Sequence, residues 1–155
     1  MAGSRKSKQI KQRKIPGETS IVQKGNPSQY YSQPPAWTFA NSDQDMWAFS
    51  KEHVGEVIWK EIIPRLRALE TQTWSEILVR DKKQNHSLDL NDLNRVAQDR
   101  LITRYIEAES LISLRVTGTH RLYGYMTGRV FNILWYDDEH GDNSKCVCRS
   151  HLKHT

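Results

Sequence analysis

The chain has 155 residues, of which 37% are hydrophobic, and its formal net charge at pH 7 is +5. This length corresponds to one domain, and no apolar run reaches the roughly 18 residues that cross a bilayer. Cys146 and Cys148 lie too close in sequence for an ordinary structural disulfide, which excludes a disulfide-rich secreted scaffold. No apolar segment follows the basic N-terminus as it would in a secretory signal. We therefore expect a cytoplasmic protein with no membrane contact.

The first 36 residues differ in composition from the rest. They hold seven basic side chains and one acidic one, whereas the rest of the chain holds 16 basic and 17 acidic side chains. Aliphatic residues are almost absent, so burial cannot offset the entropy of ordering this segment. We predict a disordered basic tail over 1–36 and a single domain over 37–155. The tail is either a nucleic-acid-binding arm, through side chains such as Lys6, Arg13 and Lys14, or a solubilising leader.

Helical spacing dominates the first half of the domain. Tyr30 and Tyr31, before the double proline, either stack on bases or dock on the domain, and we favour docking. Thr73 and Glu76 have the spacing of a capping box, which marks the start of a helix. Apolar residues at three- and four-residue steps indicate the other helices. The predicted elements are a short helix or irregular segment over 44–53, a helix over 54–69 bent at Pro64, a helix from 73 to 79, a polar loop over 80–87 and a helix over 90–104.

After Glu109 the pattern changes to the alternation of strands. Three apolar runs at 111–116, 121–126 and 130–136 are separated by short turns that contain glycine. They predict an antiparallel meander, with the preceding helices covering one of its faces. The fold class is therefore α+β.

Polar side chains on these strands are the first candidates for a site. Alternation places Tyr123 and Tyr125 on the same face as Arg121, and Arg115 lies on the polar face of the preceding strand. A solvent-exposed face of this kind suits RNA, because arginine binds phosphate through two hydrogen bonds and tyrosine stacks on bases. Arg129 extends the candidate nucleic-acid-binding set. The alternative is that each of these residues simply lies in solvent at the edge of the sheet and binds nothing.

Two histidines flank the same strands and are candidates for acid–base chemistry. His120 precedes the second strand, and His140 follows the third. A base that deprotonates a ribose 2′-hydroxyl, an arginine that stabilises the phosphorane and an acid that protonates the leaving oxygen would cleave RNA without metal. The candidate catalytic residues are Arg121, His140, His120 and Tyr123, with each histidine as acid or base.

The chain has none of the common nucleotide-binding or metalloprotease motifs. Cys146, Cys148, His151 and His154 have the residue types of a zinc site, but the two cysteines are separated by a single residue and no second ligand pair precedes them. A zinc site and thiols that bind nothing are both interpretations of this segment, and we favour the second. We accordingly expect no metal and no cofactor.

The segment from Leu111 to His140 resembles the sheet of the RelE/ParE toxin superfamily, which includes the HigB-type host-inhibition toxins. The shared order is a basic strand residue, a small turn, an arginine that opens the next strand, a hairpin, and an apolar strand followed by histidine. Here these are Arg115, Gly118, Arg121, Thr127-Gly128 and His140. The resemblance implies a RelE-like fold, cleavage of messenger RNA on the ribosome or action on gyrase, and an antitoxin as partner.

These observations favour a toxin-like endoribonuclease of a toxin–antitoxin, prophage or other mobile-element system. RNA or the ribosome would be its target, and a cognate antitoxin its protein partner. The alternative is a non-catalytic protein whose strand surface binds nucleic acid or protein and whose tail adds affinity. Growth arrest that survives loss of both Arg121 and His140 would exclude the enzyme.

Overall fold

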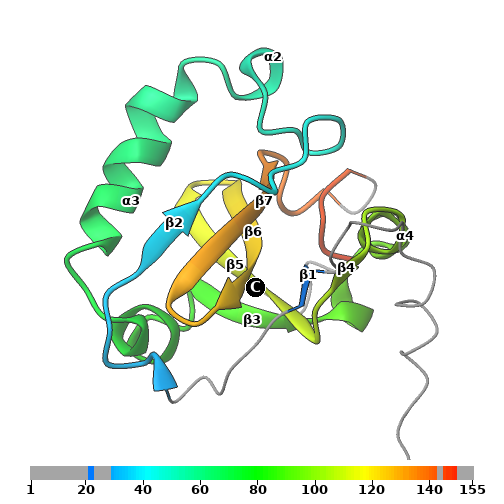
Figure 1. Ribbon diagram of the computed structural model, residues 1–155. Helices are drawn as coiled ribbons and strands as arrows, with labels where there is room; N and C mark the ends of the chain where they lie inside the picture. Colours follow the sequence, from blue (N-terminus) through cyan, green and yellow to red (C-terminus); the bar gives the residue numbers. More distant parts are fainter. Residues whose placement is uncertain (1–20, 23–28, 143–144, 150–155) are drawn as a thin grey trace, which may run out of the picture.

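The computed structural model describes residues 21–22, 29–142 and 145–149. In this part of the chain a five-stranded sheet forms the centre of the molecule, in the order β2-β7-β6-β5-β3 (Figure 1). Its strands are β2 (Ala36–Thr38), β3 (Asn85–Asp89), β5 (Ser110–Thr117), β6 (His120–Thr127) and β7 (Val130–Asp137). A separate parallel pair joins β1 (Ile21–Val22) to β4 (Ile106–Glu107).

The α+β class and the three predicted strands are confirmed, but the sheet is wider than the predicted meander. Strands β5, β6 and β7 are consecutive and antiparallel, as expected. Strand β2 adds to β7 in parallel, so the sheet is mixed. Pro34 and Pro35 precede β2, and such residues are tolerated there because β2 is a short edge strand.

Strand β3 lies where the sequence predicted a polar loop. It pairs with β5 as the second edge of the sheet. Only Asn85 and Leu88 of its five residues are buried, so it lacks the apolar alternation of an ordinary strand. The buried amide of Asn85 donates to Ile77 O at 3.3 Å and accepts from Arg115 N at 3.0 Å. Tertiary hydrogen bonds therefore position this strand, and they have no periodic signal in the sequence.

Helices occupy the predicted regions in shorter pieces. The capping box is confirmed, because Thr73 N donates to the Glu76 carboxylate at 2.9 Å and Glu76 N donates to Thr73 Oγ1 at 3.3 Å. Pro64 lies in the first turn of α3, directly after the π-helical segment η2, so the helical path changes type at the proline. The helical segments are α2 (Lys51–Val54), the π-helical η2 (Ile58–Ile62), α3 (Ile63–Leu69), the π-helical η3 (Glu76–Arg80), the 3₁₀ turn η4 (Leu90–Asp92) and α4 (Arg95–Thr103).

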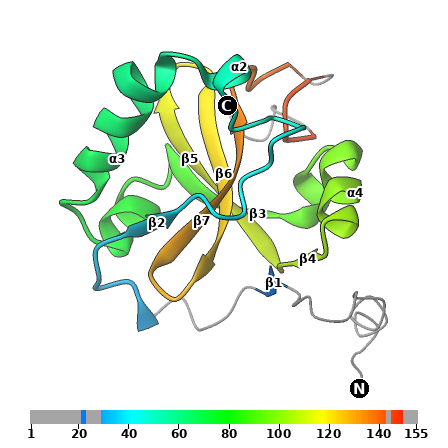
Figure 2. The same cartoon turned by 45° about the horizontal axis from the view of Figure 1, so that its top comes forward.

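Both faces of the sheet are covered, so the expectation of one open face is wrong. On the first face, η2, α3 and η3 pack through Ile62, Leu66 and Ile77 against strand residues such as Leu122. On the second face, α4 packs through Ala97 and Leu101, and the segment 145–149 adds Val147. Figure 1 and Figure 2 both show α3 and α4 on opposite sides of the strands.

Gly124 allows β7 to approach β6 closely at a bulge. A Cβ atom at position 124 would lie 2.1 Å from Asn132 O and 2.8 Å from the ring of Phe131. The register shifts here, because Tyr123 pairs with Trp135 and Gly124 pairs with Ile133. The bulge adds Leu134 to β7 and lets Leu134 and Trp135 both face the second core.

Residues 29–36, which the composition assigned to the tail, pack on the domain. Docking of Tyr30 is confirmed, because its ring is buried in the first core beside Trp74. The tail residues Lys6, Arg13 and Lys14 lie outside the described residues. Among the described residues, no helix is both long and apolar enough to span a bilayer.

Candidate functional site

Four of the residues singled out in the sequence meet on the second face of the sheet. Arg115 of β5 lies directly opposite Arg121 of β6. Tyr123 follows on the same face, and its hydroxyl lies 3.4 Å from His140 Nδ1. His86 of β3 also faces this side, because it pairs with Ser113, which in turn pairs with Tyr123. We call Arg115, Arg121, Tyr123, His86 and His140 the arginine–histidine site.

The two arginines place positive charges side by side on neighbouring strands. Arg121 donates from Nη1 to the carbonyl oxygens of Gly118, at 2.6 Å, and His120, at 3.1 Å. Burial lowers the pKa of Arg121, and the charge of Arg115 lowers it further. Asp137 pairs with Arg121 across the sheet from β7, and its charge raises the pKa of Arg121, but among the described residues neither guanidinium forms a salt bridge. Like charges directly opposite each other destabilise a sheet, so this pair favours an anionic ligand.

The backbone of Arg115 is fixed while its side chain is exposed. Beyond the end of β3, the free edge of β5 is capped by side chains instead of by a strand. Arg65 of α3 donates from Nε to Arg115 O at 2.8 Å, and Asn85 Oδ1 accepts from Arg115 N. Burial lowers the pKa of Arg65, Asp81 opposes this effect, and Arg115 adds to it. A third guanidinium is thus present at the same edge.

A buried thiol and a phenol hold the imidazole of His140. Cys148 Sγ lies 3.3 Å from His140 Nδ1 and 3.3 Å from the Tyr123 hydroxyl. Burial raises the pKa of Cys148 to about 12, and burial together with Cys148 raises that of Tyr123 well above its usual value. Both groups are therefore neutral at pH 7. They orient His140, which is itself half-buried, and neither reaches solvent.

Sequence reasoning missed His86, because it lies in the segment predicted to be a loop. Its ring is half-buried, and its pKa is lowered by burial and by the charge of Arg121. A histidine whose pKa lies below its usual value is neutral at pH 7 and suited to accept a proton. The pairing of His86 with Ser113 of β5 is what places it at the site, and this pairing could not be predicted because strand β3 itself was not.

Asp137 pairs with Arg121 across the sheet and holds the loops that follow β7. Its carboxylate accepts from Glu139 N at 2.9 Å and from Val147 N at 2.8 Å. The side chain is buried, and burial raises its pKa to about 6. These two hydrogen bonds position the segments that carry His140 and Cys148.

Three predicted site residues lie elsewhere. His120 faces the opposite side of the sheet, where its Nδ1 lies 2.5 Å from the Tyr136 hydroxyl. Tyr125 is buried, and its hydroxyl accepts from Asn41 Nδ2 at 3.2 Å, so the expectation that it stacks on a base from an exposed face is wrong. Arg129 lies in the β6–β7 turn, at the other end of β6 from Arg121. The exposure expected for Tyr123 is also wrong.

The cysteines make no metal site within the described residues, where no group of three His, Cys, Asp or Glu side chains is placed to hold a metal ion. Cys146 and Cys148 are buried free thiols, and Cys146 donates from Sγ to Cys148 O at 3.1 Å. His151 and His154 lie outside the part of the chain that the structure describes. The four-residue zinc interpretation is therefore untested.

Comparisons with protein-family models, curated proteins and solved structures found no match to this chain. The resemblance of Leu111–His140 to the RelE/ParE superfamily therefore stays a prediction.

Proposed function

We propose that this protein binds RNA at the arginine–histidine site and cleaves it as a metal-independent, toxin-like endoribonuclease. The observation that carries the proposal is the cross-strand pair Arg115–Arg121, which lies on the same face as the imidazoles of His86 and His140 and of which the Arg115 side chain is exposed. A phosphodiester would bring a negative charge to the exposed guanidinium of Arg115, which binds it with directed hydrogen bonds.

The proposed reaction is transfer of the phosphoryl group to the neighbouring 2′-oxygen. Neutral His86 accepts the proton of the 2′-hydroxyl while the 2′-oxygen forms a bond to phosphorus. The bond from phosphorus to the 5′-oxygen breaks, and the 5′-oxygen takes a proton from the imidazolium of His140. Arg115 and Arg121 stabilise the added negative charge on the phosphorane. The products are a 2′,3′-cyclic phosphate and a 5′-hydroxyl.

Tyr123 has a positioning role in this scheme. Its hydroxyl lies within hydrogen-bond reach of both His140 and Cys148 but is buried, so it acts on the imidazole and does not touch RNA. The ribosome as the site of action, an antitoxin partner and a mobile-element context are parts of the proposal that depend on the sequence resemblance alone.

The test is incubation of the purified protein with end-labelled single-stranded RNA in the presence of a chelator. We expect products that end in a 2′,3′-cyclic phosphate, and their loss in His140→Ala and His86→Ala. His53→Ala is the matched control, since His53 contacts Tyr136 O on the opposite face. Cleavage, or growth arrest on expression, that survives Arg121→Ala combined with His140→Ala would exclude the assignment.

A second function, binding without cleavage, is favoured by one observation. The hydroxyl of Tyr123 and the thiol of Cys148 are both buried against His140, which restricts movement of that ring. In this case the same RNA is retained by the protein, Arg115→Ala weakens the complex, and no cyclic-phosphate product appears.

A further inference from the structure

Positive charge continues from the arginine–histidine site around the open end of β5. Strand β3 pairs with β5 only as far as Asn85, which lies opposite Leu114, so the last residues of β5 have no neighbouring strand on this side among the described residues. Arg115 lies at this open edge, and β5 ends beside the helical layer that contains α3 (Figure 2). We use the name basic edge for the three cations around Arg115, which are Arg65, Lys82 and Lys83.

The two lysines come from the turn between η3 and β3. Gln84 N donates to Asp81 O at 3.0 Å, so Lys82 and Lys83 are the central residues of a tight turn. The residue after this turn is the first of β3, and its side chain accepts from the backbone N–H of Arg115 at 3.0 Å. Both lysine side chains are exposed. The turn therefore presents two positive charges next to the open edge of β5.

Arg65 brings a third cation to the basic edge from α3. Its Nε donates to Arg115 O at 2.8 Å, and its two terminal nitrogens form no hydrogen bond or ion pair with the described residues. A guanidinium has five N–H donors in a planar fork. Arg65 can therefore hold the backbone of β5 and still bind an anion through its terminal nitrogens.

The basic edge lacks the carboxylate partners that other basic residues of this protein have. Arg80 pairs with Asp81 at 2.9 Å, and Arg100 pairs with Asp43 at 2.8 Å. In the part of the chain that the structure describes, no salt bridge includes a member of the basic edge. The charge of Asp81 also acts on Arg65, but its carboxylate is already held by Arg80. The edge thus keeps a local positive charge that its surroundings do not neutralise.

We propose that the basic edge binds the phosphates of single-stranded RNA that flank the phosphate held by the Arg115–Arg121 pair. This inference rests on the proposed function, which identifies RNA as the ligand, and it extends the contact from one phosphate to several. Lys82 and Lys83 carry their charges on flexible side chains, so they contact phosphates and do not read bases. The affinity that the basic edge adds therefore depends on the length of the RNA and on salt.

The test is binding of two single-stranded RNAs with 2′-O-methyl riboses, which lack the free 2′-hydroxyl and therefore stay uncleaved. The longer RNA has about 12 nucleotides, and the shorter one is a dinucleotide. In Lys82→Ser combined with Lys83→Ser, we expect the longer RNA to bind about tenfold more weakly at about 0.1 M salt, and the plot of log affinity against log salt to be shallower by about 1.4, which is about 0.7 for each phosphate. Affinity for the dinucleotide should not change, because it occupies only the Arg115–Arg121 pair.

The matched control is Lys51→Ser combined with Arg129→Ser, which removes the same charge from exposed side chains elsewhere. Lys51 belongs to α2, which contacts β7 through His53, and Arg129 lies in the β6–β7 turn. Equal affinity of the lysine variant and the control for the longer RNA would overturn the proposal. So would a loss in the lysine variant that is as large for the dinucleotide as for the longer RNA.

Arg115→Ala in the same assay separates this inference from the proposed function. It should weaken binding of both RNAs, because both occupy the Arg115–Arg121 pair. Unchanged affinity of Arg115→Ala for the dinucleotide would contradict the arginine–histidine site. A loss in Arg115→Ala with none in the lysine variant would contradict the basic edge alone.

Discussion

At the residue scale, two buried aspartates show that the number of hydrogen-bond donors decides whether a buried carboxylate stays charged. Burial raises the pKa of Asp43, but hydrogen bonds from Arg100, the backbone N–H groups of residues 45 and 46, and Trp135 overcome this and hold the pKa well below its usual range. Asp137 has only two backbone donors, so burial dominates and its pKa rises to about 6. One carboxylate is therefore a permanent anion, and the other changes charge near neutrality.

Asp43 anchors the loop before α2 to α4. Its oxygens accept from Arg100 at 2.8 and 2.9 Å and from Trp135 Nε1 at 3.0 Å. Asp43→Asn leaves Arg100 without its buried partner, so we expect the free energy of unfolding in urea to fall by about 3 kcal/mol.

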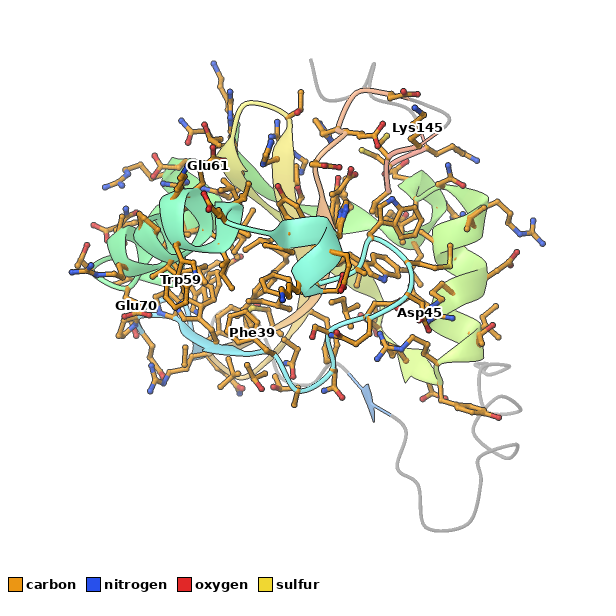
Figure 3. The ribbon with its side chains drawn as sticks, turned by 90° about the horizontal axis from the view of Figure 1, so that it is seen from above. Phe39, Asp45, Trp59, Glu61, Glu70 and Lys145 are labelled. Carbon is orange, nitrogen blue, oxygen red and sulfur yellow. The ribbon has the colours of Figure 1, made fainter. Side chains whose placement is uncertain are left out.

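Asp45→Asn is the control for this prediction. Asp45 also contacts Arg100, at 3.3 Å, but its side chain is exposed, and Figure 3 shows it in the loop beside α4. The control should cost less than about 1 kcal/mol. Equal losses in the two variants would show that Asp43 is not the anchor.

At the scale of elements, the sequence predicted those whose signals are local. The capping box at Thr73 and Glu76 and the three apolar strands depend on neighbouring residues, and they are confirmed. Strand β3 depends on the amide of Asn85, which bonds to Ile77 and to Arg115, a residue far away in sequence. The same limit affected the site: Arg115, Arg121 and Tyr123 were found from alternation, whereas His86 required the register of β3.

The sequence also did not predict that residues 145–149 pack on the second face of the sheet. This segment has no periodicity, and it is held by Val147 N to Asp137 and by Asn94 N to Val147 O at 2.6 Å. It buries Cys148 against Tyr123, and that contact turns an expected exposed tyrosine into a buried one.

Because Asp137 holds this segment, we predict that the stability of the folded protein depends on pH. The pKa of Asp137 in the folded protein, about 6, lies above its value of 3.8 in the unfolded chain. Its contribution to stability is therefore complete below pH 4 and is lost as the pH rises through 6. Between pH 7 and pH 4 it should raise the free energy of unfolding by up to about 3 kcal/mol.

Comparison of wild type and Asp137→Asn by urea unfolding at several pH values isolates this contribution. The difference between the two proteins should change steadily between pH 7 and pH 4. Asp138→Asn is the control, because Asp138 is partly exposed. A constant difference between wild type and Asp137→Asn would contradict the assignment.

At the scale of the whole molecule, the net charge of +5 is not distributed evenly between the N-terminal segment and the domain. The basic excess belongs to residues 1–36, whereas the rest of the chain has one more acidic than basic side chain. We therefore expect recognition of an anion by the domain to depend on the local Arg115–Arg121 pair, and residues 1–20 to add only non-specific electrostatic attraction.

Deletion of residues 1–20 separates the two contributions. It removes six basic side chains and one acidic one. We expect weaker RNA binding and a salt dependence that is shallower by about 0.7 for each phosphate that the shortened protein no longer neutralises, with any cleavage products unchanged. Measurement of affinity at several salt concentrations checks this. Loss of all binding and cleavage on deletion would move the function into the tail.

The affinity of Arg115→Ala for single-stranded RNA is the strictest test of an RNA site at the Arg115–Arg121 pair. Arg115 has an exposed side chain and a fixed backbone, so its truncation should leave the fold intact. We predict a loss of affinity of about tenfold in Arg115→Ala. Arg129→Ala, which alters an exposed arginine at the other end of β6, should bind like the wild type. Equal affinity of Arg115→Ala and Arg129→Ala would contradict an RNA site at the Arg115–Arg121 pair.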